Sequence, residues 1–146
     1  MKKSTLSLVL AFASITLFIS SCSKSTTTIP NTTTGGLTWI ENTATTVTAD
    51  SAYFDTRYST LHAFKGGTAK IIELNLSAGT VGTYTVSSAN SISYIASGSS
   101  TTYIATTGSV NITANASAKM TGSFSSTGTG ASLTSLSGTF IDIPVR

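Results

Sequence analysis

The chain has 146 residues, only 9% of them charged, and eight Lys and Arg against five Asp and Glu give a net charge of +3. Lys2 and Lys3 belong to a segment that we expect to be removed, so six basic residues then face five acidic ones and leave +1. A near-neutral chain without a basic cluster is a poor partner for nucleic acid or an anionic membrane surface.

The first segment predicts export. Lys2 and Lys3 precede an apolar stretch over residues 6–19, which is shorter than the about 20 residues of a membrane span and typical of a signal peptide. The stretch ends in Ile19-Ser20-Ser21-Cys22, the pattern of a bacterial lipobox, whose cysteine receives a diacylglycerol and becomes the acylated N-terminus. We therefore predict a lipoprotein signal peptide over residues 1–21. An uncleaved membrane anchor and an ordinary secretory signal are the alternatives.

Cys22 is the only cysteine, so it has no disulfide partner within the chain. An exported free thiol is a liability unless it is modified. One acyl chain binds a membrane only marginally, whereas two or three chains on one cysteine hold a protein firmly. Cys22 is therefore the predicted lipidation site, and the membrane is a predicted partner through it.

Residues 22–36 are predicted to be the acylated cysteine and a tether. Residues 23–34 are mostly Ser and Thr, show no hydrophobic periodicity, and end at Gly35-Gly36. An edge strand is the alternative, and Pro30 argues against it because proline cannot donate a ladder hydrogen bond.

Residues 37–146 are predicted to form one all-β domain, either a single antiparallel β-sandwich or a small meander barrel of about eight to ten short strands. Thr, Val, Ile and Tyr favour strands, and no stretch keeps a helical period for long. Gly66-Gly67 suits a hairpin turn with positive φ angles. Ile72, Leu74 and Leu76 share one face of the strand expected to be central. The predicted strands cover residues 37–41, 46–49, 51–58, 61–65, 68–76, 82–86, 91–96, 101–105, 109–114, 120–124 and 136–140.

The last two predicted strands repeat a short pattern. Met120-Thr121-Gly122-Ser123-Phe124 returns as Leu136-Ser137-Gly138-Thr139-Phe140, with the apolar residue, the glycine and the ring on one face. We expect residues 125–132 to link the copies into an antiparallel pair. A ring that covers an inward glycine lets a sheet curve, so the pattern indicates a structural role.

Several short strings carry a resemblance to a known family: Ile72-Glu73-Leu74-Asn75-Leu76, Gly82-Thr83-Tyr84, Ser93-Tyr94, Gly108-Ser109-Val110-Asn111-Ile112-Thr113 and the two glycine–phenylalanine copies. Together they resemble a family of small Bacteroidota lipoproteins known as domain of unknown function 6252. The resemblance runs from about Trp39 to Val145. It implies a compact antiparallel β-domain behind a lipobox, and it carries over no catalytic residues.

Acid–base chemistry has few candidates. His62 is the only histidine, and with no available cysteine it cannot complete a conventional zinc site, so we predict no metal and no cofactor. Asp55 and Glu73 both lie on predicted strands and are the candidate pair for glycoside hydrolysis, which needs two facing carboxylates. The chain has no Gly-x-Ser-x-Gly elbow and no phosphate-binding glycine loop. We therefore predict no catalytic residue.

Trp39, Tyr53 and Tyr58 are the candidate ligand-binding aromatics. Exposed rings on a sheet can stack on sugars or anchor a protein partner. The alternative places Phe54 and Tyr58 in the core and leaves Tyr53 half exposed.

These patterns favour a lipid-anchored, non-catalytic binding or accessory module of the cell envelope, with a glycan or an envelope protein as its partner. The alternatives are a glycan-acting hydrolase that uses Asp55 and Glu73, and a lipocalin-like carrier of an apolar ligand. We expect the outer membrane as the location. Lys24 follows the cysteine closely and the first acidic residue is Glu41, which favours the periplasmic face over the cell surface.

Overall fold

The computed structural model describes residues 35–44 and 46–146. The predicted signal peptide, Cys22 and nearly all of the predicted tether lie outside the described residues. Within the described part every regular element is a strand, which confirms the predicted all-β class. A search of the same part for a helix with the length and apolarity to cross a membrane finds none.

The ten strands follow the predicted positions closely in the first two thirds of the domain and are longer than predicted in the last third. They are β1 Gly36–Glu41, β2 Val47–Thr48, β3 Ser51–Asp55, β4 Thr60–Lys65, β5 Lys70–Asn75, β6 Gly82–Thr85, β7 Ser91–Ala96, β8 Tyr103–Ala116, β9 Lys119–Thr129 and β10 Ser135–Pro144.

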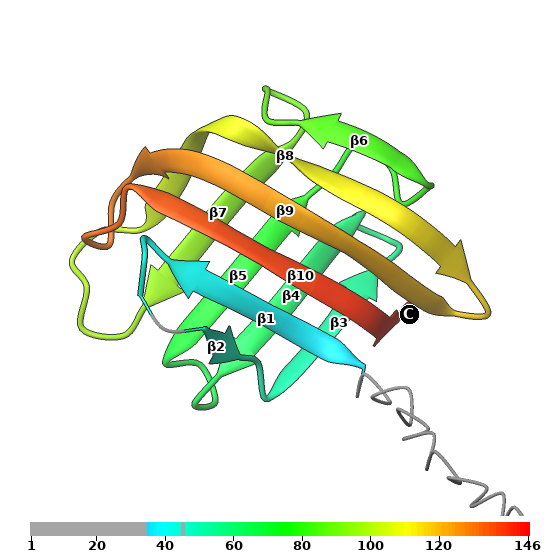
Figure 1. Cartoon of the computed structure of the whole chain (residues 1–146), viewed down its shortest axis with the longest axis horizontal. Helices are drawn as coiled ribbons and strands as arrows, with labels where there is room; N and C mark the ends of the chain where they lie inside the picture. Colours follow the sequence, from blue (N-terminus) through cyan, green and yellow to red (C-terminus); the bar gives the residue numbers. More distant parts are fainter. Residues whose placement is uncertain (1–34, 45) are drawn as a thin grey trace, which may run out of the picture. The chain divides into compact units, whose positions relative to one another are not determined.

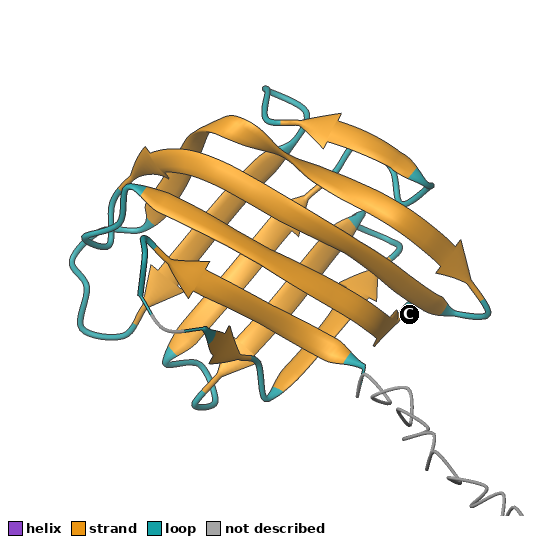
Figure 2. Ribbon diagram, viewed as in Figure 1, coloured by secondary structure: helices purple, strands orange, loops and turns teal. Residues whose placement is uncertain are grey.

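All strands belong to one curled antiparallel sheet in the order β2-β1-β10-β9-β8-β7-β5-β4-β3, with β6 also paired to β8. The curl produces two layers, and Figures 1 and 2 show the strands of the front layer crossing over those of the back layer. The front layer contains β2, β1, β10, β9, β6 and the second half of β8. The back layer contains β3, β4, β5, β7 and the first half of β8. The predicted sandwich or small barrel is confirmed.

One strand, β8, joins the two layers. Its start pairs with β7 through Tyr103 and Ile104, and its later part pairs with β6. The sequence predicted two separate strands, over residues 101–105 and 109–114. That division is wrong, because a bulge between Ala105 and Thr107 and the positive φ of Gly108, 131°, bend the strand without ending it.

The end of the chain, beyond the residues of β10 that pair with β1, lies beside the edge strand β3. Phe54 and Val145 form a parallel bridge, and the Arg146 amide donates a 2.9 Å hydrogen bond to the Phe54 carbonyl. The Thr56 amide and hydroxyl both donate to the Arg146 carbonyl, at 2.9 and 2.6 Å. These bonds partly close the sheet into a barrel.

The space between the layers is filled by side chains from the inward face of every long strand. Ile72, Leu74 and Leu76 all point inward and are buried, as predicted. β5 lies between β4 and β7 within the back layer. The largest fully buried side chains come from both layers: Trp39, Tyr94, Tyr103, Phe54, Phe140, Leu37, Leu61, Ile72, Leu74, Ile92, Ile112 and Met120.

The repeated pattern forms the predicted antiparallel pair. Phe140 lies opposite Gly122 and Phe124 opposite Gly138, so the ring of each copy covers the glycine of the other. A Cβ atom on Gly138 would lie 2.7 Å from the Phe124 ring. The predicted link over residues 125–132 is too long, because β9 runs to Thr129 and β10 begins at Ser135.

Two turn predictions have different outcomes. Gly66 and Gly67 both adopt positive φ, 63° and 67°, as predicted, within a link of four residues between β4 and β5. Tyr58 is not part of a strand: β3 ends at Asp55 and Ser59 takes a positive φ of 49°. The chain therefore turns before Tyr58, and its predicted alignment with Phe54 is wrong.

Candidate binding surface

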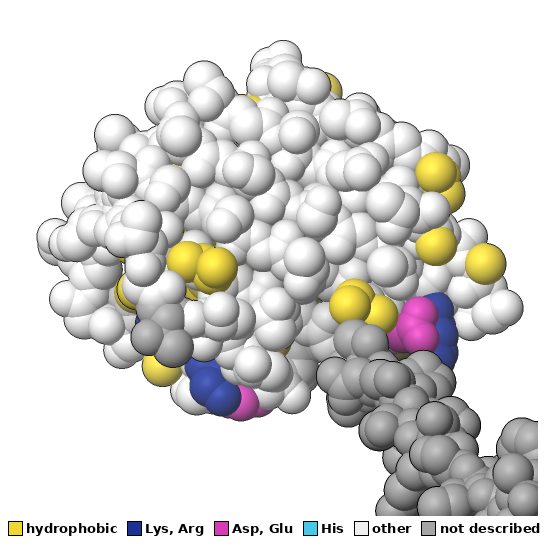
Figure 3. Space-filling model, viewed as in Figure 1, with side chains coloured by type: hydrophobic (Ala, Val, Ile, Leu, Met, Phe, Trp, Pro, Cys, Tyr) yellow, Lys and Arg dark blue, Asp and Glu magenta, His cyan; other side chains and the backbone are white. Residues whose placement is uncertain are grey.

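The outer face of the front layer is covered by hydroxyl and amide groups. The cross-strand register places Thr38, Thr139 and Ser123 side by side, and further polar residues extend this row to both sides. Figure 3 views this face and shows few hydrophobic atoms on it. Its two longest rows are Thr48-Thr38-Thr139-Ser123-Asn111-Thr83 and Ile40-Ser137-Ser125-Ser109-Thr85.

The outer face of the back layer carries rings and aliphatic side chains instead. One cross-strand row is Tyr53-His62-Glu73-Ser93-Ile104, and the next is Ser51-Phe64-Ile71-Ile95. Ile95 and Ile104 are 39% and 51% exposed, although most large apolar side chains of the domain are buried. We call the following set the aromatic face: Tyr53, His62, Phe64, Ile71, Ile95 and Ile104.

Three rings at one end of the aromatic face form a cluster. The Tyr53 and His62 ring centroids are 5.2 Å apart, and Phe64 lies 6.1 Å from Tyr53 and 6.2 Å from His62. The three rings are within 35° of parallel. The cluster arises from the register, because Tyr53 faces His62 across β3 and β4 and Phe64 follows His62 by two residues on the same face.

Charged groups lie at both ends of this cluster. The Arg146 guanidinium is 4.3 Å from the Tyr53 ring centroid, a cation–π distance. On the other side, His62 Nδ1 is 3.5 Å from a Glu73 carboxylate oxygen. A cation, two rings and a carboxylate therefore follow one another across the face.

Asp55 and Glu73, the candidate hydrolytic pair, are engaged by different neighbours. Asp55 is held by Arg57, whose guanidinium donates a 2.9 Å hydrogen bond that holds the pKa of Asp55 below its usual range. Glu73 is next to His62 and lies two residues along β5 from Asn75, which belongs to the cross-strand row of Asp55. Neither carboxylate lines any of the pockets described below.

The three candidate ligand-binding aromatics are not brought together. Trp39 points into the core and is fully buried, which differs from the exposed ring that the sequence predicted. Alternation along β1 is the physical reason, because Leu37 and Trp39 share the inward face. Tyr58 lies in a turn, 71% exposed, beneath the Arg57 guanidinium. Tyr53 alone lies on the aromatic face.

A polar network that sequence reasoning missed connects the two layers through Glu41. Its carboxylate oxygen Oε1 accepts hydrogen bonds from Lys70 Nζ (2.6 Å), Trp39 Nε1 (2.9 Å) and Tyr94 Oη (2.9 Å). Burial raises the pKa of Glu41, but the three donors, Lys70 first, outweigh burial and hold it below 4.5. Burial and the contact with Glu41 raise the pKa of Tyr94. The donors come from β1, β5 and β7, so only the folded register could reveal them.

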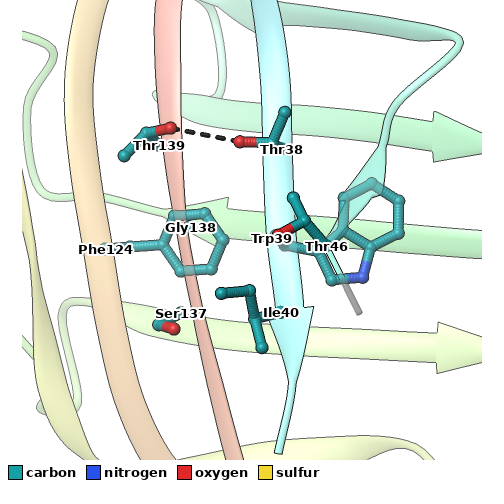
Figure 4. Close-up of a pocket in the computed structure, with 8 residues that line it drawn as sticks. All are labelled: Thr38, Trp39, Ile40, Thr46, Phe124, Ser137, Gly138 and Thr139. Carbon is teal, nitrogen blue, oxygen red and sulfur yellow. Dashed lines mark hydrogen bonds between the residues drawn. The ribbon is translucent and has the colours of Figure 1, made fainter. Parts of the chain in front are cut away.

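Three pockets lie on the described part of the domain. One of about 310 Å³ lies on the front face over Gly138, where Thr38 and Thr139 share a 3.2 Å hydrogen bond (Figure 4). Two others, of about 120 and 500 Å³, are lined by Gly35 and Gly36 at the start of β1. The smaller of these two lies where β1 and β10 of the front layer approach β3 of the back layer, and Leu37, Ala52 and Ile143 are among its lining residues.

Within residues 35–44 and 46–146, no group of three or more His, Cys, Asp or Glu side chains is placed to hold a metal ion. Comparisons of the chain with models of protein families, with curated proteins and with solved structures gave no match. The family suggested by the short strings therefore stays a prediction, and the function has to be argued from the surface itself.

Proposed function

We propose that this protein is a lipid-anchored, non-catalytic binding module of the cell envelope, and that it binds through the aromatic face. The observation that carries the proposal is the contrast between the two outer faces. Tyr53, Phe64 and the isoleucines lie on the outside of a sheet whose opposite side already forms a complete core. Their burial is therefore not needed to build the interior, and exposed apolar patches of this kind mark interaction sites.

The absence of catalysis in this proposal is supported by how the acidic residues are engaged. Asp50, Asp55 and Asp142 each lie within 4.0 Å of a Lys or Arg nitrogen, and so does Glu41. A general acid needs a raised pKa, whereas the pKa values of Glu41, Asp50 and Asp55 are lowered. The side chains that fill the space between the layers argue against an enclosed ligand, and so against the lipocalin-like carrier.

Attachment to the membrane is tested at Cys22. Wild-type chain expressed in its own cells should incorporate a labelled fatty acid and fractionate with the outer membrane, and Cys22→Ser should lose both properties. Protease treatment of intact cells then separates the two faces of that membrane: survival of the domain is expected for the periplasmic face. A wild-type chain without label would contradict the proposed anchor.

The binding surface is tested by photo-crosslinking in intact envelopes. A photoreactive side chain is placed at Phe64 on the aromatic face, and in a matched variant at Ser125 on the front face. We expect adducts from position 64 only, with a second arm in which binding of soluble envelope glycans is lost in Phe64→Ser. Equal labelling from both positions, with no glycan bound, would contradict the proposal.

A further inference from the structure

The aromatic face has opposite charges at its two ends, in an order that is complementary to itself. The Arg146 guanidinium lies on the Tyr53 ring, and the Glu73 carboxylate lies beside His62. The order across the sheet is therefore cation, ring, ring, carboxylate. If a second copy of this face is rotated by 180° and placed against the first, each cation lies opposite a carboxylate and each ring lies opposite a ring.

These two charges are also the ones left without a strong partner in the described part of the chain. Four of the five acidic residues there contact a Lys or Arg, with nitrogen–oxygen distances between 2.6 and 3.7 Å. Glu73 has only His62, at 3.5 Å. Arg146 contacts a ring and, within residues 35–44 and 46–146, no carboxylate. Both side chains are exposed enough to reach a second molecule.

We propose that the occupant of the aromatic face is a second copy of this chain. Two copies pack face to face about a two-fold axis that passes between Tyr53 and His62, so that Arg146 of each copy pairs with Glu73 of the other. An isologous interface requires this reciprocity, because a contact from one residue to another is repeated in reverse. The inference rests on the proposed function, since it takes the aromatic face as the binding surface and names its partner.

The size of the face sets the strength of the association. With the axis between β3 and β4, the overlap contains the C-terminal residues beside β3 and the strands β3, β4 and β5, whereas β7 and β8 lie outside it. Four chain segments at about 4.8 Å spacing and about 20 Å length cover about 380 Å², or about 770 Å² for two copies. Interfaces below about 1,200 Å² are typical of weak complexes, so we expect a dissociation constant on the order of 100 μM. Attachment of both copies to one membrane would raise their effective concentration and favour the dimer.

Charge reversal distinguishes a broken interface from a misfolded variant, because only a broken interface is restored when the two reversed variants are mixed. Glu73→Arg leaves two cations on the face, and Arg146→Glu leaves two carboxylates, so each variant alone should repel its own copies. Sedimentation equilibrium of the purified domain should show a dissociation constant raised about tenfold or more for each variant. An equimolar mixture of the two should associate again, because every charge then faces its opposite.

Matched control variants reverse one positive and one negative charge outside the aromatic face. Lys119 and Asp142 form an exposed pair away from the aromatic face, so Lys119→Glu and Asp142→Lys should leave the dissociation constant within about twofold of wild type. Thermal unfolding of every variant checks that the domain is folded. A loss of association in these controls equal to that in the face variants would overturn the proposal.

Other outcomes are equally decisive. A wild-type domain that stays monomeric up to about 1 mM, or a mixture that does not associate, would overturn the dimer. If crosslinks from position 64 reach a glycan or another protein while the purified domain is monomeric, the dimer fails and the proposed binding function stands. If the domain is monomeric and position 64 gives no crosslink, both fail.

Discussion

The two outer faces of the sandwich are built by the same alternation of inward and outward side chains, yet they expose different groups. On the front layer the outward positions are almost all Ser, Thr or Asn. On the back layer the same positions carry Tyr53, His62, Phe64 and three isoleucines. The inward positions of both layers are apolar and buried. Packing of the core thus constrains the alternate residues that point inward. The residues between them point outward and determine which groups the molecule exposes.

The comparison separates side chains that hold the fold from those that serve the surface. Substitution of an inward-facing residue such as Gly138 or Glu41 should lower the free energy of unfolding strongly. Substitution of an outward-facing residue on either face should change the free energy of unfolding only slightly. Among these, only substitutions on the aromatic face should weaken association. Four substitutions test this division, from the largest expected effect to the smallest.

Gly138→Ala should have the largest effect, because it adds an inward atom where there is no room. Its Cβ would contact the Thr38 carbonyl and lie 2.7 Å from the Phe124 ring. Overpacking of this kind costs about 3 kcal/mol, measured as a lower free energy of unfolding in urea. Ser137→Ala, one residue away on the outer face, is the control and should change stability by about 0.5 kcal/mol or less. Equal losses would contradict the division.

Glu41→Gln should cost about 2 kcal/mol at neutral pH, because Lys70, Trp39 and Tyr94 all lose a charged acceptor in a site only 18% exposed. Chemical denaturation at pH 7 measures the loss. The exposed acid of the Lys119–Asp142 pair gives the control, since Asp142→Asn should cost about 0.5 kcal/mol or less. A neutral result for Glu41→Gln would mean that this network does not hold the layers together.

The same residue predicts a pH dependence. The folded pKa of Glu41 lies below its ordinary value of 4.5, so its contribution is fully present above that value and is lost as pH falls through the folded pKa. Asp50 and Asp55, with Lys65 and Arg57 as their partners, shift in the same direction. Stability of the wild-type domain should therefore decline below about pH 4.5, and more steeply than that of Glu41→Gln. If wild type and Glu41→Gln lost stability in parallel as the pH falls, Glu41 would not be a source of the pH dependence.

Phe64→Thr should cost only about 1 kcal/mol, because the ring is half-buried and gains little from the core. The same change should weaken self-association, measured by sedimentation. Thr139→Val on the front face is the reciprocal control and should alter neither property. If the front-face change weakened association as much, the two faces would not differ in function.

Tyr58→Ala should have the smallest effect. The side chain is 71% exposed in a turn, so stability should change by about 0.5 kcal/mol or less and association should not change. Thermal unfolding and sedimentation measure both. A clear loss of binding would restore Tyr58 as a ligand-binding aromatic.

The sequence predicted the fold better than the surface because alternation is a local property and register is not. Period-two patterns located nearly every strand, and the glycine–phenylalanine repeat correctly predicted that β9 and β10 pair. The extent of β8 was missed because the bulge between Ala105 and Thr107 and the positive φ of Gly108 interrupt the period-two pattern. Tyr53, His62 and Phe64 meet only because β3 and β4 pair in one register. The burial of Trp39 was not predicted, because its indole N–H finds Glu41 as a partner only inside the fold.

The pairing of β1 with β10 has a consequence for the timing of folding. Gly36 lies opposite Ile141, so the first strand of the sheet finds its neighbour more than 100 residues later in the chain. Such distant contacts are slow to form because a long loop must close first. The front layer can therefore be completed only when β10 is available to pair with both β1 and β9. Export through a pore, which the proposed lipid anchor would require, would deliver β10 last and so delay closure of the sandwich to the end of the passage.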